Sequence, residues 1–476
     1  MCLGEAGIHN FMPSLSILNK PLLCYDNARS HNILINSMNL LAQKTDPSNL
    51  SIKTTNPEVY HAHWPVKDSS LVLQRCYLLA REMGIIVAAW LPTISRHEAK
   101  MLTPKHLWQD FLHAEKHQER VFELRFPRQN IDENHDPVLV ELMEQLRRSA
   151  SESELILALY EVFRPALAEA YQTYLDRADP LTDEPTFAYV QTFVRQLREQ
   201  IAEAAEIVAW AREQLSVAER DAWLGHLRAG LAAAGGVLGI EASSEWKMSP
   251  AYATRPAMVL PSTALRDPRH QVRCLFHYPR TMLDDDRARQ LAAALSHVNE
   301  AWASEAVART MAEFPKAPLE LLVKGARWCY DEMRHAQIGE RRLKAWGFDL
   351  FKDVPIDALS FNLYSEAGHL YRFGLLHEVE TRYNLAKVEM IDTFEKMGDW
   401  ETRNDIDFDN ADEAIHMRYA VDWFAHIFGR ANRQERNVYV KGAGKMYDDY
   451  LALHETALLA DQQTWLPKLH AKMGIE

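Results

Sequence analysis

The chain has 476 residues but few cysteines, few glycines and no long hydrophobic run. Its five cysteines include no Cys-x-x-Cys pair, and such an odd, scattered set indicates reduced thiols and a cytoplasmic protein. No apolar run is long enough to span a membrane, and the N-terminus lacks a basic stretch followed by an apolar core. We therefore expect a cytoplasmic protein with neither a membrane segment nor a secretion signal.

Basic residues are also in short supply. The sequence has 53 Lys and Arg against 66 Asp and Glu, for a formal net charge of −13. A large nucleic-acid surface requires a basic face, so this balance argues against nucleic acid as a partner. Only 18 residues are glycine, while residues that favour helix, such as Ala, Leu, Glu and Arg, are abundant. The composition predicts an all-α protein, and the length predicts two or three domains.

Composition and periodicity divide the sequence into four segments. Residues 1–66 are rich in Asn, Ser, Thr and Pro and predict an irregular N-terminal extension. Residues 67–236 have helical periodicity and predict a helical domain. Five prolines interrupt residues 237–283, which we interpret as an inter-domain segment. Helical periodicity resumes over residues 284–476, the predicted C-terminal domain.

Local signals refine this division. The pattern predicts helices over residues 71–90, 103–125, 153–177, 184–214 and 218–233. Thr103 and Pro104 predict a helix start, because a capping hydroxyl followed by proline in the first turn is typical of one. The acidic segment Asn404–Asp409 predicts a turn before a later helix.

Two short motifs each place a carboxylate and an imidazole three residues apart: Glu332-x-x-His335 and Glu413-x-x-His416. On a helix that spacing puts both side chains on one face. A single copy is a common pattern and more often marks a surface ion pair. Two copies, 81 residues apart and each in a helical segment, instead indicate a carboxylate-bridged two-metal site.

Such a site needs a matching glutamate for each motif. Facing positions of an antiparallel helix pair lie about 27 to 35 residues apart. Counting back from Glu332 gives Glu305, and counting back from Glu413 gives Glu380. The alternatives are Glu300 for the first position, and Glu378 or Glu389 for the second. The predicted ligand set is Glu305, Glu332, His335, Glu380, Glu413 and His416.

The ligand types also indicate the metal. Carboxylates with imidazole suit Fe(II) or Mn(II) better than a thiolate-seeking metal. Two divalent cations would neutralise four carboxylates that would otherwise repel one another when buried. We therefore expect two iron ions, or manganese with iron. Carboxylates can shift between bridging and terminal binding, which would let the two ions bind O2, the expected co-substrate. Tyr383, one turn after Glu380, is the predicted catalytic residue, because a phenol beside the metals can donate a hydrogen bond or an electron. The second ring nitrogen of each histidine needs an acceptor, and the candidates are Asp331, Asp409 and Asp412.

The C-terminal region resembles a known superfamily. Residues 285–460 resemble the ferritin-like di-iron carboxylate proteins, and Glu305–Pro315 followed by Asp331-Glu-Met-Arg-His-Ala336 is similar to a poorly characterised bacterial branch of them. The resemblance implies a four-helix bundle with two irons, or iron with manganese, oxygen chemistry and the six ligands named above. The motifs are specific for the superfamily but do not specify the reaction.

The N-terminal helical half has spacings similar to those of the C-terminal half. Asp110-x-x-His113 lies where the first motif would lie, but Ala202 takes the place of the second histidine. Residues 67–236 are therefore interpreted as a degenerate ferritin-like repeat without a working metal site. The alternative is that any two helical bundles share such spacings.

These observations favour an O2-dependent non-haem di-iron oxidase or oxygenase acting on a small organic metabolite. No flavin or nicotinamide motif is present, so electrons would come from a partner protein or from the substrate. The alternatives are a ferroxidase of the iron-storage type and a non-catalytic helical scaffold with a structural metal site. The expected partners are the small-molecule substrate, an electron-donor protein and, as an option, a second copy in a homodimer.

Overall fold

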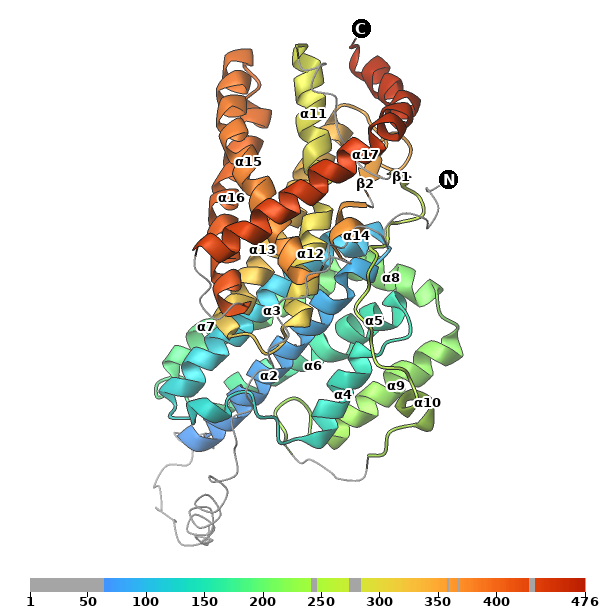
Figure 1. Ribbon diagram of the computed structural model, residues 1–476. Helices are drawn as coiled ribbons and strands as arrows, with labels where there is room; N and C mark the ends of the chain where they lie inside the picture. The colour runs from blue at the N-terminus through green and yellow to red at the C-terminus, as the bar shows by residue number, and fades with distance from the viewer. Residues whose placement is uncertain are drawn as a thin grey trace, which may run out of the picture. The chain divides into compact units, whose positions relative to one another are not determined.

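The computed structural model describes residues 64–240, 246–273, 284–357, 359–365, 368–427 and 433–475 (Figure 1). This part of the chain is predominantly helical, which confirms the all-α class. Within these ranges the strands are β1 (Gln271–Arg273) and β2 (Pro355–Asp357), which pair in parallel. Nearly all of the predicted N-terminal extension, residues 1–63, lies outside the described residues.

The first group of helices includes one or two helices in each predicted helical segment, and it adds α4, which was not predicted from the sequence. Its members are α2 (Val66–Trp90), η2 (Leu91–Thr93), α3 (His97–Glu123), η3 (Arg128–Asn130), α4 (Pro137–Arg147), α5 (Glu152–Ala158), η4 (Leu159–Phe163), α6 (Arg164–Arg177), α7 (Glu184–Glu203), α8 (Ala205–Glu213), α9 (Val217–Ala233) and α10 (Pro250–Ala253). The helix predicted over 153–177 contains a π-helical turn, η4, between α5 and α6. The one predicted over 184–214 divides at residue 204 into α7 and α8.

The predicted helix start at Thr103 is wrong. Helix α3 begins at His97, and Pro104 lies inside it. The buried Thr103 hydroxyl has no hydrogen-bond partner among the described residues, so it does not cap a helix. Pro104 removes one backbone hydrogen bond, but α3 packs against both α2 and α13, and this tertiary contact maintains the helix through the proline.

The second group of helices carries both histidine motifs. Its members are α11 (Asp286–Val298), α12 (Ala301–Glu313), α13 (Leu319–Ala345), α14 (Leu359–Ser365), α15 (His369–Met397), α16 (Trp400–Ile427) and α17 (Arg433–Met473). Helices α11 and α12 both contact α13, which also contacts α16, and α15 contacts α16 and α17 (Figure 1).

The predicted turn over residues 404–409 is also wrong, because α16 runs without a break through this segment. The acidic side chains that suggested a turn are partly buried in the fold. Asp409 is fully buried and contacts Lys387 and His297 of neighbouring helices. The acidic composition therefore reflects tertiary ion pairs, and it does not interrupt the helix.

Residues 62–476 form one compact unit, in which helices from both predicted helical domains are in contact. Helix α13 lies against α3, and α12 lies against α2. The main hydrophobic core includes Phe111 from the first group and Trp328 and Trp423 from the second. The domain boundaries placed at residues 66, 236 and 283 stay predictions.

A close approach between α11 and α13 positions the turn that follows α11. A Cβ atom on Gly339 of α13 would clash with the backbone of Val298 and Ala294. Only glycine allows this approach without a shift of either helix. The C-terminal end of α11, with His297 and the turn at Asn299 and Glu300, is thereby held beside α13.

Candidate metal centre

The two histidine motifs face each other on neighbouring helices. Glu332 and His335 share one face of α13, and Glu413 and His416 share one face of α16, because residues three apart on a helix lie on the same side. Helices α13 and α16 are in contact. All four side chains are buried, with exposed fractions between 0% and 3%.

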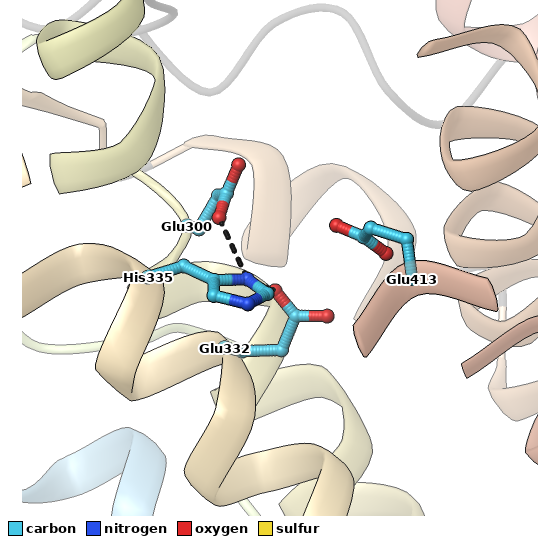
Figure 2. A group of neighbouring side chains, drawn as sticks. All are labelled: Glu300, Glu332, His335 and Glu413. Carbon is cyan, nitrogen blue, oxygen red and sulfur yellow. Dashed lines mark ion pairs between the residues drawn. The ribbon is translucent and has the colours of Figure 1, made fainter. Parts of the chain in front are cut away.

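Four side chains converge on one point. Glu300, Glu332, His335 and Glu413 each offer one ligand atom, and these atoms all lie within 4.8 Å of one another (Figure 2). Glu300 directly precedes α12, Glu332 and His335 come from α13, and Glu413 comes from α16. We call this set the main group. Three carboxylates and one imidazole are a donor set for divalent iron or manganese.

Two atoms of the main group fit a metal ion particularly well. His335 Nδ1 and Glu300 Oε2 form an ion pair with each other at 3.1 Å, and neither atom has another hydrogen-bond partner among the described residues. Both atoms are buried. This pairing requires a proton on His335, and a metal ion that displaces the proton could bind both atoms. The residues present are therefore compatible with a metal ion held by the main group.

A second group lies beside the first. His297, Glu300 and Asp409 also place one ligand atom each within 4.8 Å of the others, and Glu300 belongs to both groups. The sequence interpretation included Asp409 only as a hydrogen-bond acceptor and missed His297. A signal was available, because His297-x-x-Glu300 has the same three-residue spacing as the two motifs in reversed order. We call this set the second group.

The motif histidines contact aspartates in a crossed pattern. His335 Nε2 lies 3.3 Å from Asp412 Oδ2, and His416 Nε2 lies 3.4 Å from Asp331 Oδ2. Each aspartate directly precedes the glutamate of the opposite motif, and both are paired with arginines of α13. This crossing fixes the ring orientations, so that both Nδ1 atoms face the glutamates. Asp331 and Asp412 thus lie where the sequence interpretation expected acceptors.

His416 lies at the edge of the main group. Its Nδ1 atom is 3.2 Å from Glu332 Oε1 and 3.3 Å from Glu413 Oε2. Trp328 stacks on the His416 ring with centroids 5.2 Å apart, and its indole N–H donates a 2.7 Å hydrogen bond to Glu332 Oε1. Trp328 therefore holds a carboxylate and a histidine of the site in place.

Glu305, the glutamate predicted from α12, does not join either group. Its carboxylate is fully buried and pairs with Lys100 and with both terminal nitrogens of Arg266, at 2.7 and 2.9 Å. The preceding residue, Ser304, donates a hydrogen bond to the Cys329 carbonyl on α13. Because successive helical residues are rotated by about 100°, Glu305 points away from the metal groups toward Lys100 of α3.

The alternative at this position, Glu300, is the residue that the structure brings to the site. Helix α11 ends at Val298 and α12 begins at Ala301, so Glu300 lies in the short break between the two helices. A count along uninterrupted helices therefore placed the partner of Glu332 one and a half turns too far along the chain.

We expect Glu305→Gln to leave the metal content unchanged but to destabilise the fold. The variant leaves Lys100 and Arg266 buried without a compensating charge, a change that typically costs about 3 to 5 kcal/mol. Glu300→Gln is the matched variant and should lower the metal content instead. Urea unfolding and metal analysis of both proteins would check this, and loss of metal from a folded Glu305→Gln protein would contradict it.

Glu380 and Tyr383 lie on α15, and their side chains are outside those that the structure describes. Of the alternatives to Glu380, Glu389 is exposed and Glu378 is half-buried, and neither belongs to the two groups. The described side chain that α15 contributes is Lys387, two turns after Glu380. Its Nζ atom lies 2.7 Å from Asp409 Oδ1 and 2.8 Å from Glu413 Oε1.

Burial and neighbouring charges shift the pKa values of the main group. Burial, together with the charge of Glu332, raises the pKa of Glu413 to about 7. Burial also acts to raise the pKa of Glu332, but hydrogen bonds to His335 and His416 outweigh it and lower the pKa to about 2. Burial acts to lower the pKa of His335, but the charge of Asp409 and other nearby carboxylates hold it well above its usual value. Without metal, the group therefore retains protons on His335 and, below pH 7, on Glu413.

Metal affinity should consequently fall as the pH drops below 7. A metal ion binds the neutral imidazole and the carboxylate, so it must displace the protons on His335 and Glu413. Each displaced proton adds roughly one log unit of affinity per pH unit, and we expect a slope above one between pH 6 and 7. Titration calorimetry with Mn(II) in buffers of different ionisation enthalpy would measure this proton release. An affinity independent of pH would show that the group is already deprotonated.

An open pocket lies on the opposite side of α13, toward α3. It has a volume of about 500 Å³, and its lining includes His97, Met101, Glu340 and Phe351. A smaller enclosed cavity shares His97, Met101 and Glu340 with it and reaches Ala301, next to Glu300 in the chain. The smaller cavity borders the α11–α12 turn through Val298 and Ala301, and neither cavity is lined by members of the main group.

The N-terminal half has a buried ion pair where the degenerate repeat would hold a metal. Arg164 donates hydrogen bonds of 2.6 and 2.8 Å to the two carboxylate oxygens of Asp110, and a third of 2.6 Å to Gln200. Arg164 and Asp110 are both fully buried. His113 contacts Gln196, at 2.9 Å. Within described residues 64–240 no group of metal-ligating side chains is found, and the Arg164 guanidinium neutralises the carboxylate instead.

The comparisons with known proteins add no relative. A scan against protein-family models gives no match, and searches of curated proteins and of solved structures find no similar chain. None of the described helices has both the length and the apolar character needed to cross a membrane. Fold and site together define a helical protein with a buried cluster of glutamate and histidine able to hold a metal ion.

Proposed function

We propose that this protein is a metal-dependent oxidase or oxygenase of the ferritin-like type, which uses O2 to oxidise a small organic molecule. The observation that carries the proposal is the convergence of the buried Glu332, His335 and Glu413 and the partly buried Glu300 on one point. Their oxygen and nitrogen donors favour iron or manganese, and such an ion, when bound, would supply redox chemistry with O2.

The arrangement of the helices supports the ferritin-like part of the proposal. Ligand-type side chains come from the α11–α12 turn, from α13 and from α16, and α15 adds Lys387 to the same cluster. In ferritin-like bundles, glutamates from two helices and Glu-x-x-His motifs from two others project inward in this way. Here the motif helices α13 and α16 are in direct contact.

Neighbouring side chains hold the candidate metal ligands in a fixed orientation before any ion or substrate binds. Trp328 and the crossed aspartates hold the glutamates and imidazoles in orientation, so little rearrangement is needed when an ion binds. Burial of Glu332, His335 and Glu413 limits their contact with bulk water and strengthens the electrostatic interactions among them. Such a preorganised, dry site suits reactions in which a reactive species must be kept from water.

A second candidate is a non-catalytic helical scaffold, and one observation favours it. The carboxylates of the cluster already contact Lys387, and the adjoining aspartates are paired with arginines of α13. A network neutralised in this way could stabilise the fold without any redox chemistry.

Anaerobic loading with Fe(II), followed by exposure to O2, separates these candidates. The proposed enzyme should oxidise its bound iron on exposure to O2 and, in the presence of a metabolite extract, yield an oxidised product detectable by mass analysis. Glu413→Ala should lose both signals while remaining helical by circular dichroism. Iron accumulation far beyond a few ions per chain would instead indicate storage, and absence of iron oxidation in the wild type would favour the scaffold.

A further inference from the structure

Lys387 is a buried cation between the two metal groups. Its Nζ atom lies 2.7 Å from Asp409 Oδ1 and 2.8 Å from Glu413 Oε1, and 13% of its side chain is exposed. Asp409 belongs to the second group and Glu413 to the main group. The ammonium therefore contacts one member of each group.

In the second group, side chains of the protein already contact both oxygens of the Asp409 carboxylate. Asp409 Oδ1 accepts a hydrogen bond from Lys387, and Asp409 Oδ2 lies 3.1 Å from His297 Nε2. A divalent ion bound to Asp409 would lie within a few ångströms of the ammonium, in a buried place where little water screens the repulsion. The Lys387 ammonium is therefore the cation that neutralises the second group.

The main group differs in how its ligand atoms are paired. Glu300 Oε2 and His335 Nδ1 form an ion pair with each other at 3.1 Å and have no other hydrogen-bond partner among the described residues. Lys387 contacts Glu413 there but none of the other three members by a hydrogen bond or an ion pair. Among the described residues, no lysine or arginine is paired with these two ligand atoms of the main group, whereas the Lys387 ammonium contacts Asp409 of the second group.

We propose that the centre takes one divalent metal ion, bound by Glu300, Glu332, His335 and Glu413, and that the Lys387 ammonium takes the place of a second ion. This inference rests on the proposed metal function and replaces the two ions expected from the sequence by one. One divalent ion and one ammonium nearly balance the four carboxylates of the two groups. The Arg164 guanidinium at Asp110 is a second case in this chain of a protein cation at a buried carboxylate.

Counting bound ions tests the assignment. Wild type and Lys387→Met are loaded anaerobically with Mn(II), desalted and examined by metal analysis and electron paramagnetic resonance. We expect about one Mn(II) per chain with the spectrum of an isolated ion in the wild type. Removal of the ammonium should open the second group, so that Lys387→Met binds about two ions and shows the spectrum of a coupled pair.

Two further variants serve as controls. Lys396→Met removes an exposed lysine of the same helix, which pairs with Asp392 and does not contact either group, so its metal content should equal that of the wild type. Lys387→Arg keeps the positive charge and should also bind about one ion. If Lys387→Met does not fold, the wild-type spectrum and the Lys387→Arg count still decide the question.

The outcomes separate this assignment from the proposed function. A coupled pair of ions in the wild type would overturn the role of Lys387 and leave the metal centre intact. A single ion in a folded Lys387→Met protein would also overturn the role of Lys387 without affecting the proposed metal centre. Failure of both proteins to bind Mn(II) would overturn the proposed metal function, and the Lys387 assignment with it.

Discussion

Replacement of Glu332, His335 or Glu413 by alanine is expected to remove the bound metal while leaving the helices intact. Each side chain supplies one of the four converging ligand atoms and has an exposed fraction of at most 3%. Removal of a single ligand takes away a direct bond to the ion, so its effect should exceed the roughly 10- to 100-fold loss typical of residues that only orient a ligand. We expect metal affinity to fall by more than about 100-fold in each variant.

Asp412→Asn is the matched comparison for this prediction. Asp412 contacts His335 Nε2 but supplies no atom to the main group, so it should orient the imidazole without binding the ion. Its substitution should cost about 10- to 100-fold in metal affinity, clearly less than His335→Ala. Competition of Mn(II) against a fluorescent chelator would measure both affinities. Equal losses in the two variants, or full metal retention by Glu332→Ala, would refute the ligand assignment.

Arg164→Met is expected to cause the largest loss of stability among single substitutions in the first group of helices. The variant leaves the Asp110 carboxylate buried with no opposite charge, and breaking a buried ion pair in this way typically costs about 3 to 5 kcal/mol. Burial raises the pKa of Asp110, and the Arg164 charge opposes that rise, so the variant should shift Asp110 further toward its neutral form.

The double variant Asp110→Leu with Arg164→Met provides the control. It removes both charges, and apolar replacement of a buried pair is often close to neutral in stability. Urea unfolding followed by circular dichroism should therefore show the double variant to be more stable than Arg164→Met alone. Metal content should stay at the wild-type level in both, because Asp110 belongs to neither metal group. A double variant as unstable as the single one would show that packing, and not charge, dominates at this position.

Local chemistry in the sequence was sufficient for the helical class and for the two motifs. The three-residue spacing of Glu332 with His335, and of Glu413 with His416, has a meaning as soon as each segment is helical, because helix geometry alone then fixes which side chains share a face. The structure brings all four of these side chains into one buried cluster. Asp331, Asp409 and Asp412 could be named as candidate acceptors, but helix geometry did not choose among them.

Residues on other elements required the tertiary structure. Glu305 and Glu300 are both acidic and lie within two helical turns of each other, and the choice between them depends on where the α11–α12 turn falls against α13. His297 reaches the cluster because Gly339 permits close approach of α11. The positions of Glu300 and His297 depend on how the helices pack, and residue spacing in the sequence does not predict that packing.

The sequence by itself determined that this protein is helical and that two carboxylate–histidine pairs each occupy one helix face, because helix periodicity acts over neighbouring residues. Only the tertiary structure decided which partners complete the cluster: Glu300 in place of Glu305, and Lys387 beside Asp409. The physical reason is that a buried charge is compensated by whichever opposite charge or ligand lies within a few ångströms, and that distance is set by the packing of helices remote in the sequence.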